Sequence, residues 1–152
     1  MRTLTPLTRQ RGIALVETAI TLPFLLFVML AATEFTNAFV THTTLTKAVR
    51  DGARWAAEDA IDNTGFNLTP ALQLEAQNLV VYGNPAGTGA PAVAGLTVTD
   101  VTVVRLPASE NIQVSVTFPY AGILGSVLPS FGYGANISTL FNMSATSTMR
   151  AL

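Results

Sequence analysis

The most continuous apolar stretch of the 152-residue chain lies near its N-terminus. Across residues 13–40 the only charged side chains are Glu17 and Glu34. A membrane-spanning helix needs about 20 mostly apolar residues to cross about 30 Å of hydrocarbon, and residues 13–34 would measure about 32 Å at 1.5 Å per residue. The pattern therefore predicts a transmembrane helix over residues 13–40.

The helical period continues past this segment over residues 41–61, with small residues on one face. Ala48, Gly52 and Ala56 recur at every fourth position, which is the spacing of a seam where another element can approach closely. We expect the seam to pack on the protein's own domain; the alternative is a neighbour's helix. The two segments together predict one helix from about Ile13 to about Ile61.

A second helix is predicted between Thr69 and Gly83. Thr69 is a suitable N-cap with proline at the first helical position, and Gly83 is a suitable C-terminal stop. Its apolar stripe consists of Leu72, Ala76, Leu79 and Val80.

The pattern then becomes alternating and predicts three antiparallel strands. They cover residues 96–106, 111–118 and 137–149, with "PASEN" as a hairpin connection between the first two. Because the apolar face of such a sheet must be covered, we predict an α+β domain over residues 62–152 with the helices as its cover. The side chains expected on that face include Ile112, Val114, Val116, Phe118, Phe141, Met143, Ala145 and Met149.

The connection "YAGILGSVLPSFGYGA" (residues 120–135) is unusually apolar. Folded back as a short helix it would plug the core, and this is the interpretation that we favour. Exposed, it would form a patch suited to a partner or to the membrane surface.

Composition excludes several classes of function. The net charge of −1 and the lack of a dense basic stripe do not indicate a nucleic-acid-binding protein. The absence of cysteine excludes disulfides and thiolate metal sites, and His42 is the only histidine. We find no phosphate-binding loop and no catalytic or metal-ligating cluster, so we expect neither an enzyme nor a cofactor.

Glu17 is the unusual residue of the apolar segment. A carboxylate costs about 2.5–3.5 kcal/mol at the centre of a membrane helix and less near the interface, so Glu17 is either a tolerated interfacial acid or a group with a partner. A cut between Gly12 and Ile13 would supply one, because the new amine would be positive and could pair with the Glu17 of an adjacent subunit. The leader removed by that cut contains Arg2, Arg9 and Arg11.

A short basic leader followed by Gly12, with glutamate fifth after that glycine, resembles the processing site of type IV pilin-like proteins. The segments "ITLPFLLFVMLAATEF", "AVRDGARWAAEDA" and "FNMSATSTMR" resemble the TadE-like family of the tight-adherence (type IVb) pilus system. The resemblance covers most of the chain. It implies a minor pseudopilin of pilin-like shape that takes part in pilus biogenesis and cell adhesion.

The resemblance also implies processing, partners and localisation. A prepilin peptidase would remove the leader 1–12 by cutting after Gly12, leaving Ile13 as the new N-terminus and Glu17 as the assembly carboxylate. The implied partners are that peptidase, other pilins and pseudopilins, and the pilus assembly platform. The implied location is the bacterial inner membrane, crossed once, with a cytoplasmic N-terminus and a periplasmic C-terminal domain, from which the protein can enter a surface pilus.

Two alternatives remain open at the level of sequence. The chain could be a secreted soluble protein whose ordinary signal peptide ends at "LAA" before Thr33. It could also be a membrane-anchored periplasmic binding module, or an enzyme held by the same anchor, which the missing chemistry disfavours.

Overall fold

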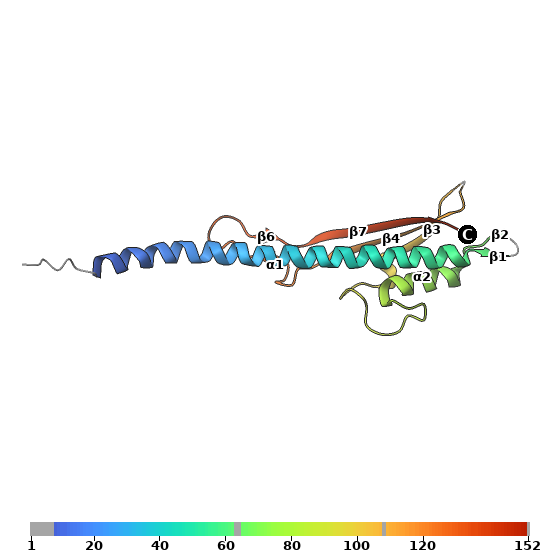
Figure 1. Ribbon diagram of the computed structural model, residues 1–152, viewed down its shortest axis with the longest axis horizontal. Coiled ribbons are helices and arrows are strands. Elements are labelled where there is room, and N and C mark those ends of the chain that lie inside the picture. The colour runs from blue at the N-terminus through green and yellow to red at the C-terminus, as the bar shows by residue number, and fades with distance from the viewer. Residues whose placement is uncertain (1–7, 63–64, 108, 152) are drawn as a thin grey trace, which may run out of the picture.

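The computed structural model describes residues 8–62, 65–107 and 109–151. Residues 1–7 of the expected leader therefore lie outside the described part. Figure 1 shows a rod formed by one long helix, α1 (Thr8–Asp59), with an α+β unit packed against its C-terminal half. This is the predicted class: a long apolar helix, a second helix and a three-stranded antiparallel sheet.

The sheet has the strand order β3-β4-β7 and consists of β3 (Val101–Arg105), β4 (Asn111–Tyr120) and β7 (Phe141–Arg150). The second helix is α2 (Pro70–Tyr82), and a 3₁₀ turn, η1 (Val98–Asp100), precedes β3. Two short strand pairs complete the described elements: β1 (Ile61–Asp62) with β2 (Gly65–Phe66), and β5 (Val127–Leu128) with β6 (Ile137–Ser138).

The core lies between the sheet and the C-terminal half of α1. Ile112, Val114 and Val116 of β4 are fully buried, so the predicted alternation of this strand is confirmed. The residues facing them and α2 include Leu45, Val49, Ala53 and Ala56 of α1, and Ala60 directly after it. Burial of apolar surface contributes about 25 cal/mol of stabilising free energy per Å², and this contribution holds the sheet against the helix.

The small-residue seam of α1 packs on the protein's own α2, as expected. A Cβ atom added at Gly52 would lie 2.5 Å from Val80 Cγ2 and 3.1 Å from the Ala76 carbonyl oxygen. Only glycine therefore lets the two helix backbones approach this closely.

Both predicted caps of α2 are confirmed. The Thr69 side chain accepts a hydrogen bond from the Leu72 amide at 3.2 Å, and Gly83 adopts φ 74° while its N–H donates to the Leu79 carbonyl. The predicted stripe is wrong at one position, since Leu79 is half-buried whereas Val81 is fully buried. The following segment folds back over the opposite face of α2, where the Ala92 N–H donates to the Val81 carbonyl at 2.7 Å.

The first strand is shorter than predicted. It begins at Val101 rather than Leu96, because the Asp100 carboxylate accepts hydrogen bonds from the Thr97 amide at 2.9 Å and the Thr97 hydroxyl at 2.7 Å. These bonds turn the backbone into η1, a local competition typical of Asp and Thr side chains.

The last strand also begins later, at Phe141 rather than Ile137, because Ile137 and Ser138 pair with β5 instead. Met143 and Ala145 are buried as predicted, and Met149 is half-buried. Phe141 remains 48% exposed, although its ring contacts that of Tyr120 in a tilted arrangement at a centroid distance of 5.1 Å.

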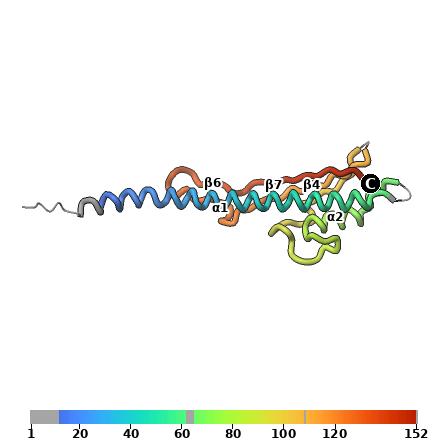
Figure 2. The backbone as a smooth tube through the Cα atoms, in the orientation of Figure 1, coloured from blue at the N-terminus to red at the C-terminus, as the bar shows by residue number. Residues whose placement is uncertain are grey.

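The apolar connection between β4 and β7 is not the short helix that we favoured. Residues 121–140 form an extended excursion with the β5–β6 pair, and Figure 2 shows it running back along the N-terminal half of α1. Pro129 and the positive φ angles of Gly125, Gly132 and Gly134 explain why a helix does not form there. We call residues 121–140 the strap.

Candidate functional site

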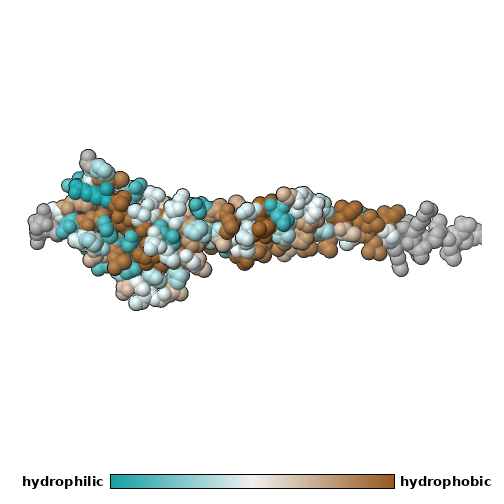
Figure 3. Space-filling model, turned by 180° about the vertical axis from the view of Figure 1, so that it is seen from behind, coloured by the Kyte–Doolittle hydropathy of each residue, from teal (hydrophilic) through white to brown (hydrophobic). Residues whose placement is uncertain are grey.

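The N-terminal half of α1 exposes most of its apolar side chains, although the strap covers part of it. Figure 3 shows the apolar colour along the rod and the hydrophilic colours over the α+β end. This helix is long and apolar enough to cross a membrane, and none of its most apolar window is buried. It is therefore compatible with a single-pass anchor. The most exposed of these side chains are Ile13, Leu15, Val16, Ile20, Met29, Phe35 and Phe39.

The predicted processing and assembly residues lie on this exposed helix. Helix α1 runs without interruption through the Gly12–Ile13 bond. Ile13 and Glu17 border a shallow hollow together with Gly12, Val16 and Ile20. Among the side chains that the structure describes, none hydrogen-bonds to the Glu17 carboxylate, which is exposed.

Gly12 is not required by the packing of the chain. A Cβ atom added there would meet nothing within 4 Å, in contrast to the crowded position of Gly52. The fold of this chain therefore gives no reason for a glycine at position 12.

The second acid of the apolar segment is buried. Glu34 is only 7% exposed, and its Oε1 accepts a hydrogen bond from the Tyr120 hydroxyl at 2.8 Å. The Leu124 amide lies 3.4 Å from the other carboxylate oxygen, and the Asn37 side-chain amide donates to the Tyr120 hydroxyl oxygen at 2.5 Å. We call Glu34, Asn37 and Tyr120 the Glu34 cluster.

The backbone at the start of the strap is shaped around this carboxylate. A Cβ atom at Gly122 would collide with the Glu34 side chain, so glycine is needed for the close approach. Burial and then the hydrogen bond to Glu34 raise the pKa of the Tyr120 hydroxyl above its ordinary value of 10.0. The cluster thus fixes the end of β4 to α1.

The strap reaches far along the apolar part of α1. The Tyr133 hydroxyl donates to the Ile20 carbonyl, and the Tyr133 ring meets the Phe24 ring edge-on at 6.1 Å. The predicted exposed patch is present here in place of the favoured helix. Its exposed apolar side chains are Ile123, Leu124, Val127, Phe131, Tyr133, Ile137 and Leu140.

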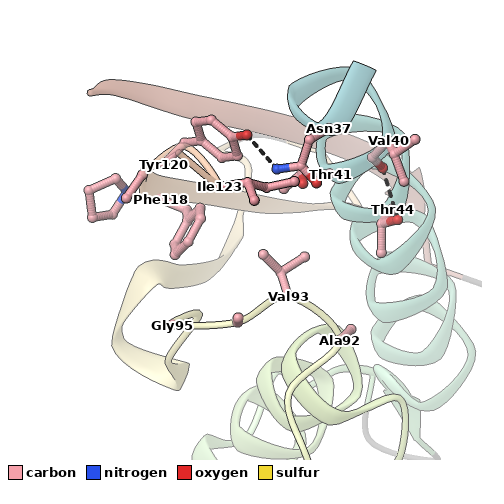
Figure 4. Close-up of a pocket in the computed structure, with 13 residues that line it drawn as sticks. Asn37, Val40, Thr41, Thr44, Ala92, Val93, Gly95, Phe118, Tyr120 and Ile123 are labelled. Carbon is pink, nitrogen blue, oxygen red and sulfur yellow. Dashed lines mark hydrogen bonds between the residues drawn. The ribbon is translucent and has the colours of Figure 1, made fainter. Parts of the chain in front are cut away.

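Two apolar hollows lie between α1 and the segments that pack on it. The first, of about 550 Å³, lies between α1 and the segment 92–95, and Figure 4 shows the Asn37–Tyr120 hydrogen bond at its wall. The second, of about 640 Å³, lies between α1 and the start of β7. We call the second one the β7 groove. His42, for which sequence reasoning gave no role, lines it.

Sequence reasoning missed the role of Glu34, which we noted only as one of the two charged side chains across residues 13–40. The signal available was its position: it is the second acid in an otherwise uncharged run of residues 13–40. Its partner Tyr120 lies 86 residues away, so no local pattern could have named it.

Comparison with known proteins agrees with the geometry of α1. The family described as TadE-like protein matches residues 12–54, which include the expected processing residues, the apolar segment and the start of the small-residue seam. No curated protein and no solved structure matches the chain. Residues 12–54 of the chain are therefore similar to the TadE-like family, the one that the sequence led us to expect.

Proposed function

We propose that the protein is a minor pseudopilin of a tight-adherence pilus, anchored in the inner membrane by α1 and taken into the pilus after removal of its leader. The observation that carries the proposal is the exposed apolar surface of α1 over residues 13–33, where Glu17 is the one charged side chain, within the segment that matches the TadE-like family. Such a surface is stable only in lipid or against other apolar helices.

Processing after Gly12 is supported by two features. A glycine at this position has no packing role in the chain, which fits a requirement set by an external peptidase. Cutting there would place the new Ile13 amine one turn from Glu17, since residues four apart share a helix face. The amine and the positive end of the helix dipole would then both lower the cost of the carboxylate in an apolar environment.

The proposed partners are a prepilin peptidase, sister pilins or pseudopilins and the assembly platform. The proposed orientation has the N-terminus in the cytoplasm and the domain of residues 62–152 on the periplasmic side, with the part of the strap that contacts Ile20 and Phe24 lying along the apolar segment of α1. Structural assembly without catalysis is the role proposed, and no cofactor is part of it.

A soluble protein released by signal peptidase before Thr33 fits the contacts less well. That cut would remove Ile20 and Phe24, which the strap contacts through Tyr133. It would also leave Glu34 one residue from a new terminus, although its burial under Tyr120 depends on an intact helix.

The N-terminal residue of the mature protein, determined by mass spectrometry of the membrane and pilus fractions, tests the proposal. We expect Ile13; Thr33 would support a secreted protein, and Met1 a plain anchor.

Substitution at Glu17 tests the assembly role. Glu17→Ala should retain membrane insertion and lose incorporation into pili, whereas Thr18→Ala, a neutral exposed neighbour, should lose neither. Normal incorporation of Glu17→Ala would refute the role assigned to this carboxylate.

A further inference from the structure

Strand β7 is an edge strand with an open side. It pairs only with β4, over ten consecutive residue pairs without a bulge. Edge strands are usually protected by charges, prolines or bulges. Residues 141–149 contain no charged residue and no proline, and only Arg150 at the end is charged.

The register tells which backbone groups of β7 are free. The Ala151 N–H donates to the Glu110 carbonyl, so the odd-numbered residues of β7 direct their N–H and C=O groups toward β4. The even-numbered residues, among them Asn142 and Ser144, direct theirs to the open edge. Among the described residues, none hydrogen-bonds to the outward backbone groups of Asn142 or Ser144.

The β7 groove lies directly beside this open edge. Asn142 and Ser144 line it from the strand, and Phe35 and Phe39 line it from α1. The two phenylalanine side chains are 74% and 63% exposed. The site thus combines free backbone hydrogen-bonding groups with an apolar wall, which are the two requirements for adding a β-strand.

We propose that the open edge of β7 and the β7 groove bind an extended segment of a sister pilin-class subunit as an added strand. The segment would be uncharged, with apolar side chains at alternate positions facing Phe35 and Phe39. Its other side chains would be small or hydroxylated, because they would extend the outer face of β7, which presents Asn142, Ser144, Thr146 and Thr148.

A second copy of the chain fits the site poorly; this step rests on the proposed membrane anchoring. β7 runs in the same direction as α1 (Figure 1). An antiparallel β7–β7 pair would therefore point the two α1 helices in opposite directions, which two anchors in one membrane cannot do. A parallel β7–β7 pair would turn the polar outer face of one strand, with its Ser144, toward the phenylalanine wall of the other.

Pairing with β3 of a second copy does not fill the groove either. β3 has only five residues, and its register places it level with Ala145–Met149 through Val116 and Ile112 of β4. In two copies anchored at the same depth in one membrane, β3 of one copy would therefore end short of the groove residues Asn142 and Ser144 of the other. The edge of β3 is also covered, since the Gln77 side chain donates to the Val101 carbonyl at 2.9 Å.

Amide hydrogen exchange on the full-length protein in nanodiscs tests the proposal, with a synthetic peptide of the sequence NIQVSVTFPY as the probe. This peptide copies residues 111–120, which alternate in the required way and already pair with the inner side of β7. In the free protein the Ser144 amide should exchange at least about 100-fold faster than that of Ala145. The peptide should slow Ser144 at least about tenfold, whereas a peptide of the same composition with its apolar residues consecutive should not.

Variants separate the edge from the groove. Ser144→Pro removes an outward N–H while leaving the bonds to β4, and it should abolish protection by the peptide at the neighbouring outward amides of Asn142 and Thr146. Ser144→Ala keeps the N–H and should retain protection at those amides. In case the proline variant does not fold, Phe39→Ser should weaken peptide binding at least about tenfold. Leu74→Ser, an exposed apolar position on α2 that is 51% exposed, should leave binding unchanged.

Three results would overturn the proposal: a slow Ser144 amide without peptide, equal protection by both peptides, or a disulfide-linked homodimer of Ser144→Cys in membranes. The last is readable because the chain has no cysteine of its own. Peptide binding does not depend on leader removal or on Glu17. If the peptide does not bind but the parent protein enters pili normally, only the proposal for the β7 groove is refuted. If the peptide binds and the Glu17→Ala variant also enters pili normally, only the assembly role of Glu17 is refuted.

Discussion

Replacing Tyr120 with phenylalanine tests the interpretation that the Glu34 cluster holds the α+β unit on α1. The change removes one hydroxyl, which donates to Glu34 at 2.8 Å and accepts from Asn37 at 2.5 Å. A hydrogen bond to a charged group contributes about 1.5–3 kcal/mol, and a buried polar group left without its partner adds its own penalty. Because Tyr120 is 3% exposed and Glu34 is 7% exposed, water cannot easily replace the hydroxyl.

We therefore expect Tyr120→Phe to lower the free energy of unfolding by about 2–3 kcal/mol, or the Tm by about 5–10 °C for a chain of this size. The fluorescence of Trp55, the only tryptophan, reports on the transition because its side chain packs against the core. Tyr133→Phe is the matched control, since its hydroxyl bonds a helix carbonyl at the exposed surface and should contribute less than about 1 kcal/mol. Equal stability of Tyr120→Phe and the parent protein would refute the reasoning.

The same pair of proteins should differ in their response to alkaline pH. The folded protein raises the pKa of Tyr120 above 10.0, so above that pH the folded state binds more protons than the unfolded state. The contribution of Tyr120 to stability is then complete below about pH 10 and is lost as the pH rises through the folded pKa. The difference in unfolding free energy between parent and Tyr120→Phe should shrink in this range, as urea titrations from pH 8 to 11 would measure; a constant difference would contradict the predicted shift.

Three further predictions concern packing and capping. Gly52→Ala should cost about 1–3 kcal/mol of unfolding free energy because its Cβ would press on Val80; thermal unfolding would measure it, with Gly12→Ala as the unaffected control for stability. Gly122→Ala should displace Glu34, and NMR chemical shifts at the Leu124 amide would show whether the strap moves. Thr69→Ala should cost about 1 kcal/mol through loss of the α2 N-cap, a value that unchanged urea midpoints would contradict.

The predicted elements that matched the structure are those coded by local patterns. An uncharged run with helical spacing produces α1, and a threonine–proline start and a glycine stop bound α2. The alternation of β4 fixes which of its faces is buried, because a one-residue slip would expose Ile112, Val114 and Val116. The processing and assembly roles of Gly12, Ile13 and Glu17 stay predictions, since they rest on spacing along one segment.

The expectations that failed are those in which a group bonds to a distant or competing partner. The Asp100 carboxylate accepts a hydrogen bond from the Thr97 amide, and β3 is therefore shorter than predicted. Ile137 and Ser138 paired with β5 and shortened β7. The strap is extended because its glycines and Pro129 disfavour a helix, and Tyr133 connects it to α1.

The sequence by itself thus determined the apolar helix, the α+β class and the exposed acid at position 17, because each depends on periodicity or spacing within a few turns of chain. Only the tertiary structure decided that Glu34 is buried under Tyr120, that the strap lies along α1, and that β7 is left with an open edge beside a groove. The physical reason is that these features depend on groups separated by about a hundred residues. These contacts contribute to stability only when the sheet and the long helix come together, which also excludes water from the Glu34 carboxylate.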